Sequence, residues 1–373
     1  MFLILMTAAV LIGLALISGF LMFWKNSLPF SNANKHENHP LISIIIPARN
    51  EENRIAPLLK SLVEQKDLSL EIIVVDDAST DRTIEIAKKI GARVLRNDTL
   101  EEGWTGKSAA CWIGAKVAKG EWLLFLDADT RLHDPFSLKR LARAYRSGGS
   151  RGILSLQPYH TIKNPYENLS VIFNIIVIVG MNVFTIWERK LKGAGSFGPC
   201  ILSNRQDYFA SGGHASVRHA VMDDLALGEA FTDKGLPVHC VSGRGLINFQ
   251  MYPEGFGQLV EGWTKNFGTA SQSTHPIVVV MISFWISGGF LTVPFLFGAV
   301  WSQSIGWIIA AMIAYLAYMI QFFWLARRTG DFRYWTLVLY PLQFVFFTSI
   351  FLWSLYVTKV RHTVSWRGRK MKV

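Results

Sequence analysis

The sequence predicts an α/β domain with a parallel, doubly wound sheet, attached to helices that span a membrane. Between residues 41 and 157, short apolar runs alternate with amphipathic stretches, which is the pattern of strands and helices in such a sheet. Apolar segments of about 20 residues, long enough to cross a bilayer, lie before and after this region. Half of the 373 residues are hydrophobic, 13 are Trp and 25 are Phe, and the mean hydropathy is positive, which together exclude an ordinary soluble protein.

The N-terminal segment Phe2–Trp24 carries no charge before Lys25, and it predicts a membrane helix over residues 1–24. A cleaved signal peptide is the alternative, but no basic stretch begins the segment and no A-x-A-like site precedes Trp24. We therefore expect an uncleaved anchor. Lys25 favours a cytoplasmic position for the chain that follows, which begins with a polar linker at residues 25–40.

The α/β domain is predicted over residues 41–270. Its predicted elements, in order, are a strand at 41–46, a helix with the apolar face Ile55, Leu58, Leu59 and Leu62, a strand at 71–75, a helix capped by Ser79–Asp81, a strand at 92–95, a helix at 107–118, and strands at 121–126 and 153–157. Helical connections between consecutive strands favour parallel pairing.

Two carboxylates end the strand that begins at Trp122. Asp127 and Asp129 are two residues apart, so they face the same side of an extended chain and can reach one hard cation. Ligands of open α/β sheets bind at the carboxyl ends of the strands. The pattern predicts a Mg2+ or Mn2+ site that stabilises a departing diphosphate. An acidic turn, with Asp134 capping the next helix, is the alternative interpretation.

An apolar stretch at residues 168–186 is interrupted by Asn174, Gly180 and Asn182. A membrane span here would divide the α/β domain. We therefore expect a helix that is buried or lies in the membrane interface.

The C-terminal part is predicted as a second membrane region at residues 276–358, followed by a basic tail at 359–373. Its candidate spans are 276–300, 305–325 and 335–357. Arg327, Arg328 and Arg333 indicate a cytoplasmic loop before the last span. With the N-terminal anchor, three spans would put the basic tail outside, against the positive-inside rule. Either the last segment re-enters around Pro341 or a span is miscounted.

Charge and cysteine content restrict the partners. The net charge of +11 is concentrated near predicted membrane ends, which indicates an anionic membrane surface rather than nucleic acid. Cys111, Cys200 and Cys240 are scattered and odd in number, so neither a disulfide framework nor a zinc site is predicted. A reducing cytoplasmic setting for the polar domain fits best.

Three motifs, in this order, resemble those of family 2 glycosyltransferases with a GT-A fold. They are Pro47-Ala48-Arg49-Asn50-Glu51-Glu52, Val75-Asp76-Asp77-Ala78-Ser79-Thr80-Asp81 and Asp127-Ala128-Asp129. The resemblance implies that a nucleotide-sugar donor contacts Pro47, Ala48, Arg49, Glu51, Asp77 and Asp127. A carboxylate such as that of Asp77 can accept hydrogen bonds from ribose hydroxyls or a base N–H. For Asp76, a role as a turn or helix-cap residue is as good an interpretation as direct contact with the donor.

Lys107 follows Gly106 at the start of a predicted helix. A P-loop would need glycine where Glu101 stands, so that motif is excluded. In the family, a Gly-Lys pair at this point opens a helix that lines the nucleotide pocket. The resemblance makes Lys107 a donor-binding candidate, with a solvated lysine as the alternative.

The resemblance also implies a catalytic base. Met222-Asp223-Asp224-Leu225-Ala226-Leu227-Gly228 matches the family's acidic pair, with Asp224 in the base position and Asp223 replacing the usual Glu. Such a base removes the acceptor's proton during attack on the anomeric carbon. Two acids in the first turn of a helix are the structural alternative.

A further family motif, Gln-x-x-Arg-Trp, is only partly present. Trp263 is retained, but Gly262 stands in place of the Arg and the Gln is shifted by one position. That motif is typical of processive polysaccharide synthases, so its incomplete form argues against chain elongation. Trp263 remains a candidate for contact with the acceptor.

Further blocks resemble a narrower group, the carotenoid-acid glycosyltransferases of staphyloxanthin-type synthesis. They are Ser155–His160, Gly180–Phe184, Phe197–Pro199, Gly212–His214 and Glu261–Lys265, and the resemblance extends from the N-terminal anchor to Trp366–Arg369. It implies inverting transfer of glucose from UDP-glucose to the carboxylate of a lipidic C30 carotenoic acid at the cell membrane, alongside other carotenoid-pathway enzymes.

Two alternatives stand beside this hypothesis. Another lipid, such as a hopanoid, a diacylglycerol or a ceramide-like molecule, could be the acceptor. A transporter or scaffold is the non-enzyme alternative, but the apolar segments contain few ionisable residues, which argues against a transport pathway. The presence of both Asp127 and Asp129 argues against a vestigial domain. The sequence does not discriminate between UDP-glucose and UDP-galactose, between Mg2+ and Mn2+, or between a monomer and a dimer.

Overall fold

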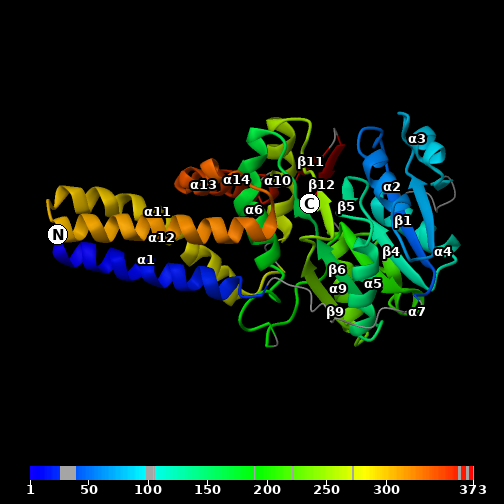
Figure 1. Ribbon diagram of the computed structural model, residues 1–373, viewed down its shortest axis with the longest axis horizontal. Helices are drawn as coiled ribbons and strands as arrows, with labels where there is room; N and C mark the ends of the chain where they lie inside the picture. The colour runs from blue at the N-terminus through cyan, green and yellow to red at the C-terminus, as the bar shows by residue number, and fades with distance from the viewer. Residues whose placement is uncertain are drawn as a thin grey trace. The chain divides into compact units, whose positions relative to one another are not determined.

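The computed structural model describes residues 1–25, 39–97, 104, 106–188, 190–220, 222–270, 273–359, 363–366 and 369–372 (Figure 1). Most of the predicted linker, and parts of the predicted basic tail, lie outside the described residues. The chain divides into two compact units: residues 27–159 with 194–250, and residues 1–26 with 160–193 and 251–373. The predicted domain at 41–270 differs from this division, because residues 160–193 and 251–270 belong to the unit with the apolar helices.

The first unit is built on a mixed sheet. Seven strands of the described chain form it in the order β3-β2-β1-β4-β8-β6-β9. They are β1 (Ile42–Ala48), β2 (Leu70–Asp76), β3 (Arg93–Arg96), β4 (Trp122–Leu126), β6 (Ile153–Gln157), β8 (Cys200–Asn204) and β9 (Val238–Ser242). The pairs β1–β2, β2–β3, β1–β4 and β6–β9 are parallel.

The expectation of a wholly parallel sheet is wrong at β8. This strand pairs antiparallel with both β4 and β6, with Leu124 and Leu154 each opposite Leu202. β8 follows the loop at residues 194–199, and an antiparallel neighbour needs no helical crossover to enter a sheet. The sequence analysis did not identify either β8 or β9 as a strand.

Helices cover both faces of this sheet. They are α2 (Ile55–Val63), α3 (Thr83–Ile90), α4 (Lys107–Val117), α5 (Ser137–Ser147), α7 (Arg205–Ala210), α8 (Gly213–Ser216) and α9 (Asp223–Asp233). Because successive strand residues face opposite sides, Ile44 packs in the core shared with α2 and α5, and Ile45 packs in the core shared with α4 and α9. This double burial accounts for the continuous apolar runs of the strands.

Short strands complete the unit. β5 (Thr130–Leu132) pairs antiparallel with β10 (Ile247–Phe249). β4 ends at Leu126 and β5 begins at Thr130, so the predicted metal ligands Asp127 and Asp129 lie in the turn between these two strands. At β7 (Tyr159–His160) the chain passes from the first unit to the second.

The second unit consists mainly of helices. They are α1 (Phe2–Met22), the 3-10 helix η1 (Pro165–Ser170), α6 (Val171–Val179), α10 (Phe256–Ala270), α11 (Pro276–Trp301), α12 (Ile305–Thr329), α13 (Tyr334–Val338) and α14 (Tyr340–Lys359), with a terminal hairpin of β11 (Thr363–Trp366) and β12 (Arg369–Lys372). Among the described residues, four helices are long and apolar enough to span a membrane: Phe2–Met22, Pro276–Trp301, Ile305–Thr329 and Tyr340–Thr358. The chain is therefore a membrane protein.

The last predicted span begins later than expected. The helical conformation is interrupted at Leu339, between α13 and α14. Pro341 lies in the first turn of α14, where a residue without a backbone N–H loses no helical hydrogen bond. The predicted helix at residues 168–186 is also shorter. α6 ends at Val179, followed by Gly180 and by Asn182 with a left-handed φ of 68°.

Three of the spanning helices, α1, α11 and α12, run side by side (Figure 1). A polar group fixes their contacts inside the bundle. Gln321 of α12 donates to the carbonyl oxygen of Leu16 in α1 (2.6 Å) and accepts the indole N–H of Trp285 in α11 (3.0 Å). The buried amide of Gln321 and the indole N–H of Trp285 are thus paired within the apolar surroundings.

Alanine in place of Gly288 is expected to lower the thermal stability of the helical unit. A Cβ at Gly288 in α11 would lie 2.2 Å from the Cβ of Ala15 in α1, so the two helices would have to separate. Overpacking of this kind costs about 1–3 kcal/mol. The measurement is the midpoint of thermal unfolding of the detergent-purified protein. Gly13→Ala in α1 is the matched control, because no atom beyond its own stretch of helix lies within 4 Å of its Cβ position. Equal midpoints for the two variants would contradict the close α1–α11 contact.

Candidate active site

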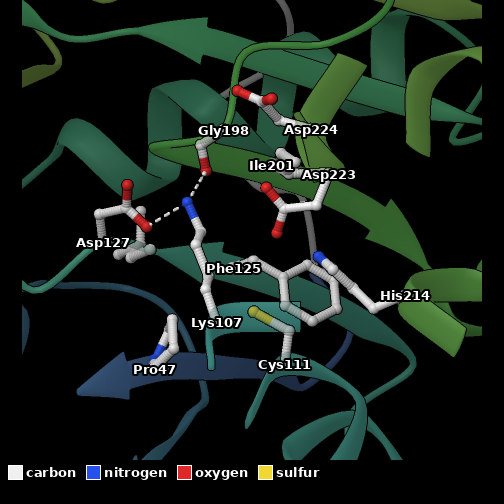
Figure 2. A pocket seen from close by; sticks show the side chains of 11 residues that line it. Pro47, Lys107, Cys111, Phe125, Asp127, Gly198, Ile201, His214, Asp223 and Asp224 are labelled. Carbon is white, nitrogen blue, oxygen red and sulfur yellow. Dashed lines mark hydrogen bonds and ion pairs between the residues drawn. The ribbon is translucent and has the colours of Figure 1, made fainter. Parts of the chain in front are cut away.

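A small pocket lies in the first unit, beside the carboxyl ends of β1 and β4 (Figure 2). Its wall combines the start of α4, the loop before β8 and the first turn of α9. The lining residues are Pro47, Lys107, Cys111, Phe125, Leu126, Asp127, Gly198, Ile201, His214, Asp223 and Asp224. Five predicted site residues therefore meet here: Pro47, Lys107, Asp127, Asp223 and Asp224.

Lys107 is the cation of this pocket. Its ammonium group lies 2.6 Å from Oδ1 of Asp127 and 3.3 Å from the carbonyl oxygen of Gly198 (Figure 2). Burial alone would lower the pKa of Lys107, but the carboxylates of Asp127 and Asp223 outweigh it and raise the pKa above its ordinary value. The ammonium group therefore stays charged, although Lys107 is the first residue of α4 and the helix dipole disfavours a cation at that end.

Asp129 lies in the turn that follows Asp127. Burial, together with the nearby carboxylates of Asp127 and Glu51, raises its pKa to about 7. The turn is held by Thr130, whose backbone N–H and hydroxyl both donate to the carbonyl oxygen of Asp127 (3.1 and 2.7 Å). Asp127 and Asp129 are thus close enough to repel each other. Among the described residues, no group of three His, Cys, Asp or Glu side chains converges as a complete metal site.

Asp223 and Asp224 begin α9. In Figure 2 the Asp223 carboxylate turns toward Lys107 and His214, whereas the Asp224 carboxylate lies farther from Lys107, beyond Gly198. Burial and the neighbouring Asp223 raise the pKa of Asp224 to about 6. The backbone of Asp224 is anchored by the hydroxyl of Ser196, which donates to its carbonyl oxygen (2.7 Å).

The remaining predicted donor contacts lie at the ends of β1 and β2. Asp77 accepts hydrogen bonds from Arg49 (3.3 Å) and from the Asn97 side chain (2.7 Å), and its own N–H donates to the carbonyl oxygen of Ala48 (2.9 Å). The backbone N–H of Glu51 donates to the Thr83 hydroxyl (2.8 Å). These bonds tie the loops after the two strands together.

Asp76 behaves as a turn residue. Its Oδ2 accepts the backbone N–H of Ser79 (3.2 Å), across a turn in which Ala78 has a left-handed φ of 58°. This contact fits the turn interpretation that the sequence left open.

Comparison with known proteins identifies the family of this chain. The family profile described as glycosyl transferase family 2 matches residues 43–208. Two curated relatives, the 4,4'-diaponeurosporenoate glycosyltransferases of Staphylococcus aureus strains USA300 and MRSA252, are each 39% identical over 90% of this chain and 89% of their own length. The chain is a family 2 glycosyltransferase. It is accordingly a hexosyltransferase.

A solved structure supports the fold. The mannosyltransferase PcManGT from Pyrobaculum calidifontis, solved in complex with GDP-Man and Mn2+, is similar over 94% of this chain and 99% of that one, with a TM-score of 0.52 and 16% identity. At this identity the likeness concerns the fold, and it confirms the predicted GT-A architecture of the glycosyltransferase.

Trp263 is a predicted site residue that lies outside the pocket, as Ala48, Arg49, Glu51, Asp77 and Asp129 also do. It lies in α10, in the second unit, with 2% of its surface exposed. Its indole N–H donates to the Ser170 hydroxyl (3.0 Å), and its ring stacks on Phe173 with centroids 4.6 Å apart. Packing within its own unit explains this tryptophan of the glycosyltransferase, and contact with an acceptor stays a prediction.

The pocket also contains residues without an assigned role in the sequence analysis. Cys111 follows Lys107 by one helical turn. Phe125 comes from β4, which was predicted only as an apolar run, and Ile201 comes from β8, which was not predicted. His214 appears in the sequence analysis only at the end of the block Gly212–His214, without a role of its own. A polar residue after two glycines was the available signal for it.

Proposed function

We propose that the enzyme transfers glucose from UDP-glucose to the carboxylate of 4,4'-diaponeurosporenoate or a closely similar C30 carotenoic acid, forming a glucosyl ester. The observation that carries the proposal is the 39% identity, over nine-tenths of the chain, to relatives named for that acceptor. The resemblance of its motifs to those of the family implies UDP-glucose as the donor and a displacement that inverts the anomeric carbon.

The donor nucleotide would lie over the joined loops after β1 and β2. Asp77 supplies acceptor oxygens for ribose hydroxyls or a base N–H, and Arg49 and Asn97 hold its carboxylate in position. Lys107 projects from the start of α4 into the pocket, where its ammonium group can neutralise diphosphate oxygens.

Asp127 and Asp129 would hold a Mg2+ or Mn2+ ion. Carboxylate oxygens are the ligands that these cations prefer. The raised pKa of Asp129 reflects burial first and then repulsion from the carboxylates of Asp127 and Glu51, and a cation would relieve that repulsion. The ion found with GDP-Man in the mannosyltransferase of the same fold supports this assignment. When bound, the ion would supply positive charge for the departing diphosphate.

The transfer would be a single displacement. One carboxylate oxygen of the acceptor forms a bond to the anomeric carbon, the bond from that carbon to the diphosphate oxygen breaks, and UDP leaves with the electron pair. A carboxylic acid has an ordinary pKa near about 4, so the acceptor is already ionised at neutral pH and no proton needs to move. Asp224 would then matter less than in an enzyme that activates a hydroxyl.

The apolar helices fit a lipid-soluble acceptor. They would hold the enzyme in the cell membrane as a multi-pass protein. Lys25 and the pair Arg327 and Arg328 favour a cytoplasmic catalytic unit by the positive-inside rule. Other enzymes of carotenoid synthesis would then supply the acid and consume the ester within the same membrane.

The deciding measurement is UDP release by the detergent-purified enzyme with UDP-glucose and Mn2+, with and without 4,4'-diaponeurosporenoic acid. We expect release that requires both the acid and the metal, and a base-labile glucosyl ester as product. Metal-dependent release only with a hydroxyl lipid would retain the transferase and overturn the acceptor. A rate of UDP release that does not change when metal is added or chelated would overturn the metal-binding role of Asp127 and Asp129.

A further inference from the structure

His214 forms part of the pocket wall opposite Lys107 (Figure 2). Its imidazole is 2% exposed and packs against the ring of Phe125, with centroids 4.9 Å apart. Asp223 lies on the same side of the pocket. The imidazole is thus a buried polar group at the site where substrate must enter.

One neighbour determines which ring nitrogen of His214 carries the proton. The Tyr208 hydroxyl accepts the backbone N–H of His214 (3.2 Å) and lies 2.9 Å from the imidazole Nδ1. Within the described chain, this hydroxyl contacts no other hydrogen-bond acceptor, so its own hydrogen points at Nδ1. Burial raises the pKa of Tyr208 well above its ordinary value, so the hydrogen is retained. Nδ1 is therefore an acceptor, and the proton of the neutral imidazole sits on Nε2.

Two glycines make this contact possible. Gly212 and Gly213 have left-handed φ values of 86° and 50°. A Cβ at Gly213 would lie 2.5 Å from Cζ of Tyr208, so a larger residue could not bring the His214 backbone over the hydroxyl. The local chain is built to hold His214 against Tyr208 in one orientation.

The Nε2–H group has no hydrogen-bond partner among the described residues, although it belongs to a buried ring on the pocket wall. Burial lowers the pKa of His214 to about 4, against the opposing effect of Asp223, so the ring is neutral at pH 7. A donor that faces a pocket in this way can form a hydrogen bond with a ligand. The wall therefore offers one fixed, uncharged donor to substrate.

We propose that the Nε2–H of His214 binds one oxygen of the acceptor's carboxylate and so selects acids as acceptors, an inference that rests on the proposed function. An incoming carboxylate meets Asp223 and Asp224, which repel it, and therefore needs a donor on this side of the pocket. Holding one oxygen leaves the second oxygen to attack the anomeric carbon.

An uncharged donor suits this task. The proton stays on Nε2 throughout, because a carboxylate is far too weak a base to deprotonate a neutral imidazole, and the displacement itself moves no proton. The bond orients the nucleophile without neutralising it. His214 is thus a specificity-determining residue for the acceptor, whereas Tyr208 is a positioning residue that acts through His214.

The test compares His214→Phe with His214→Gln in the full-length, detergent-purified enzyme. Phenylalanine keeps a ring against Phe125 but has no donor, and glutamine places an amide N–H about as far from the backbone as Nε2. We expect His214→Phe to lower kcat/KM for 4,4'-diaponeurosporenoic acid about 10- to 100-fold through KM, as loss of a hydrogen bond to a charged group predicts. His214→Gln should recover most of this loss. The KM for UDP-glucose should stay within about twofold in both variants.

Controls separate recognition from folding and from the proposed function. His219 is exposed and outside the pocket, and His219→Phe should leave both KM values unchanged. Thermal unfolding and UDP binding establish that each variant is folded. An unchanged acceptor KM in His214→Phe, or equal losses in the phenylalanine and glutamine variants, would overturn the inference alone. A wild-type enzyme that releases no UDP with the acid would overturn the proposed function, and this inference with it.

Discussion

Asparagine in place of Asp127 is expected to reduce glucosyl transfer at least about 10³-fold, because a divalent ion at a departing diphosphate supplies several kcal/mol of transition-state stabilisation. Asparagine keeps the size of the side chain but removes the negative charge that faces Lys107 at 2.6 Å. Higher Mn2+ concentrations should not restore the wild-type rate. The measurement is acid-dependent UDP release over a series of Mn2+ concentrations.

The same exchange at Asp233 is the matched control, since that carboxylate is exposed at the far end of α9 and should leave turnover unchanged. Asp129→Asn should resemble Asp127→Asn if both carboxylates hold the ion. The variants must unfold at temperatures close to that of wild type for the comparison to count. A folded Asp127→Asn enzyme with more than about one-tenth of the wild-type rate would exclude Asp127 as a metal ligand.

The strands that could be predicted are those whose signal is local. β1, β2 and β4 are apolar runs that end at polar residues, and double burial makes such runs readable without knowledge of their neighbours. β8 has a similar composition, but its antiparallel placement between β4 and β6 depends on contacts with residues far along the chain. The same holds for the division into units, which joins residues 1–26 to residues 251–373.

The site divides along the same line. Asp127, Lys107, Asp223 and Asp224 were identified from short motifs, and the pocket brings all four together. The role of His214 could not be predicted, because it depends on which nitrogen the Tyr208 hydroxyl meets, a matter of side-chain geometry. Trp263 shows the opposite case: a motif marked it, and contact with Ser170, 93 residues away, gives it a place in the core of the other unit.

Asn in place of Asp224 is expected to raise stability at neutral pH while reducing turnover less than about tenfold. A general base that deprotonates a hydroxyl is worth about 10²–10⁴ in rate, but an acceptor that is already a carboxylate has no proton to lose. Its stability effect follows from the pKa of Asp224, which is raised from an ordinary 3.8 to about 6 in the folded enzyme by burial and by Asp223. Between these values the folded state binds more protons than the unfolded state, so stability falls as the pH rises through this window.

The gain of Asp224→Asn should therefore be absent below about pH 4, grow up to about pH 6 and stay constant above it, at about 1–2 kcal/mol for a partly exposed carboxyl. Thermal unfolding of both proteins between pH 4 and 8 measures this gain, and Asp233→Asn should show no such trend.

The turnover of Asp224→Asn tests the acceptor independently of stability. If folded Asp224→Asn loses more than about 100-fold with UDP-glucose binding intact, a base is required and the acceptor atom is a hydroxyl. The partly buried Asp224 would then be kept, at a cost in stability, for a proton transfer that a carboxylate acceptor does not need.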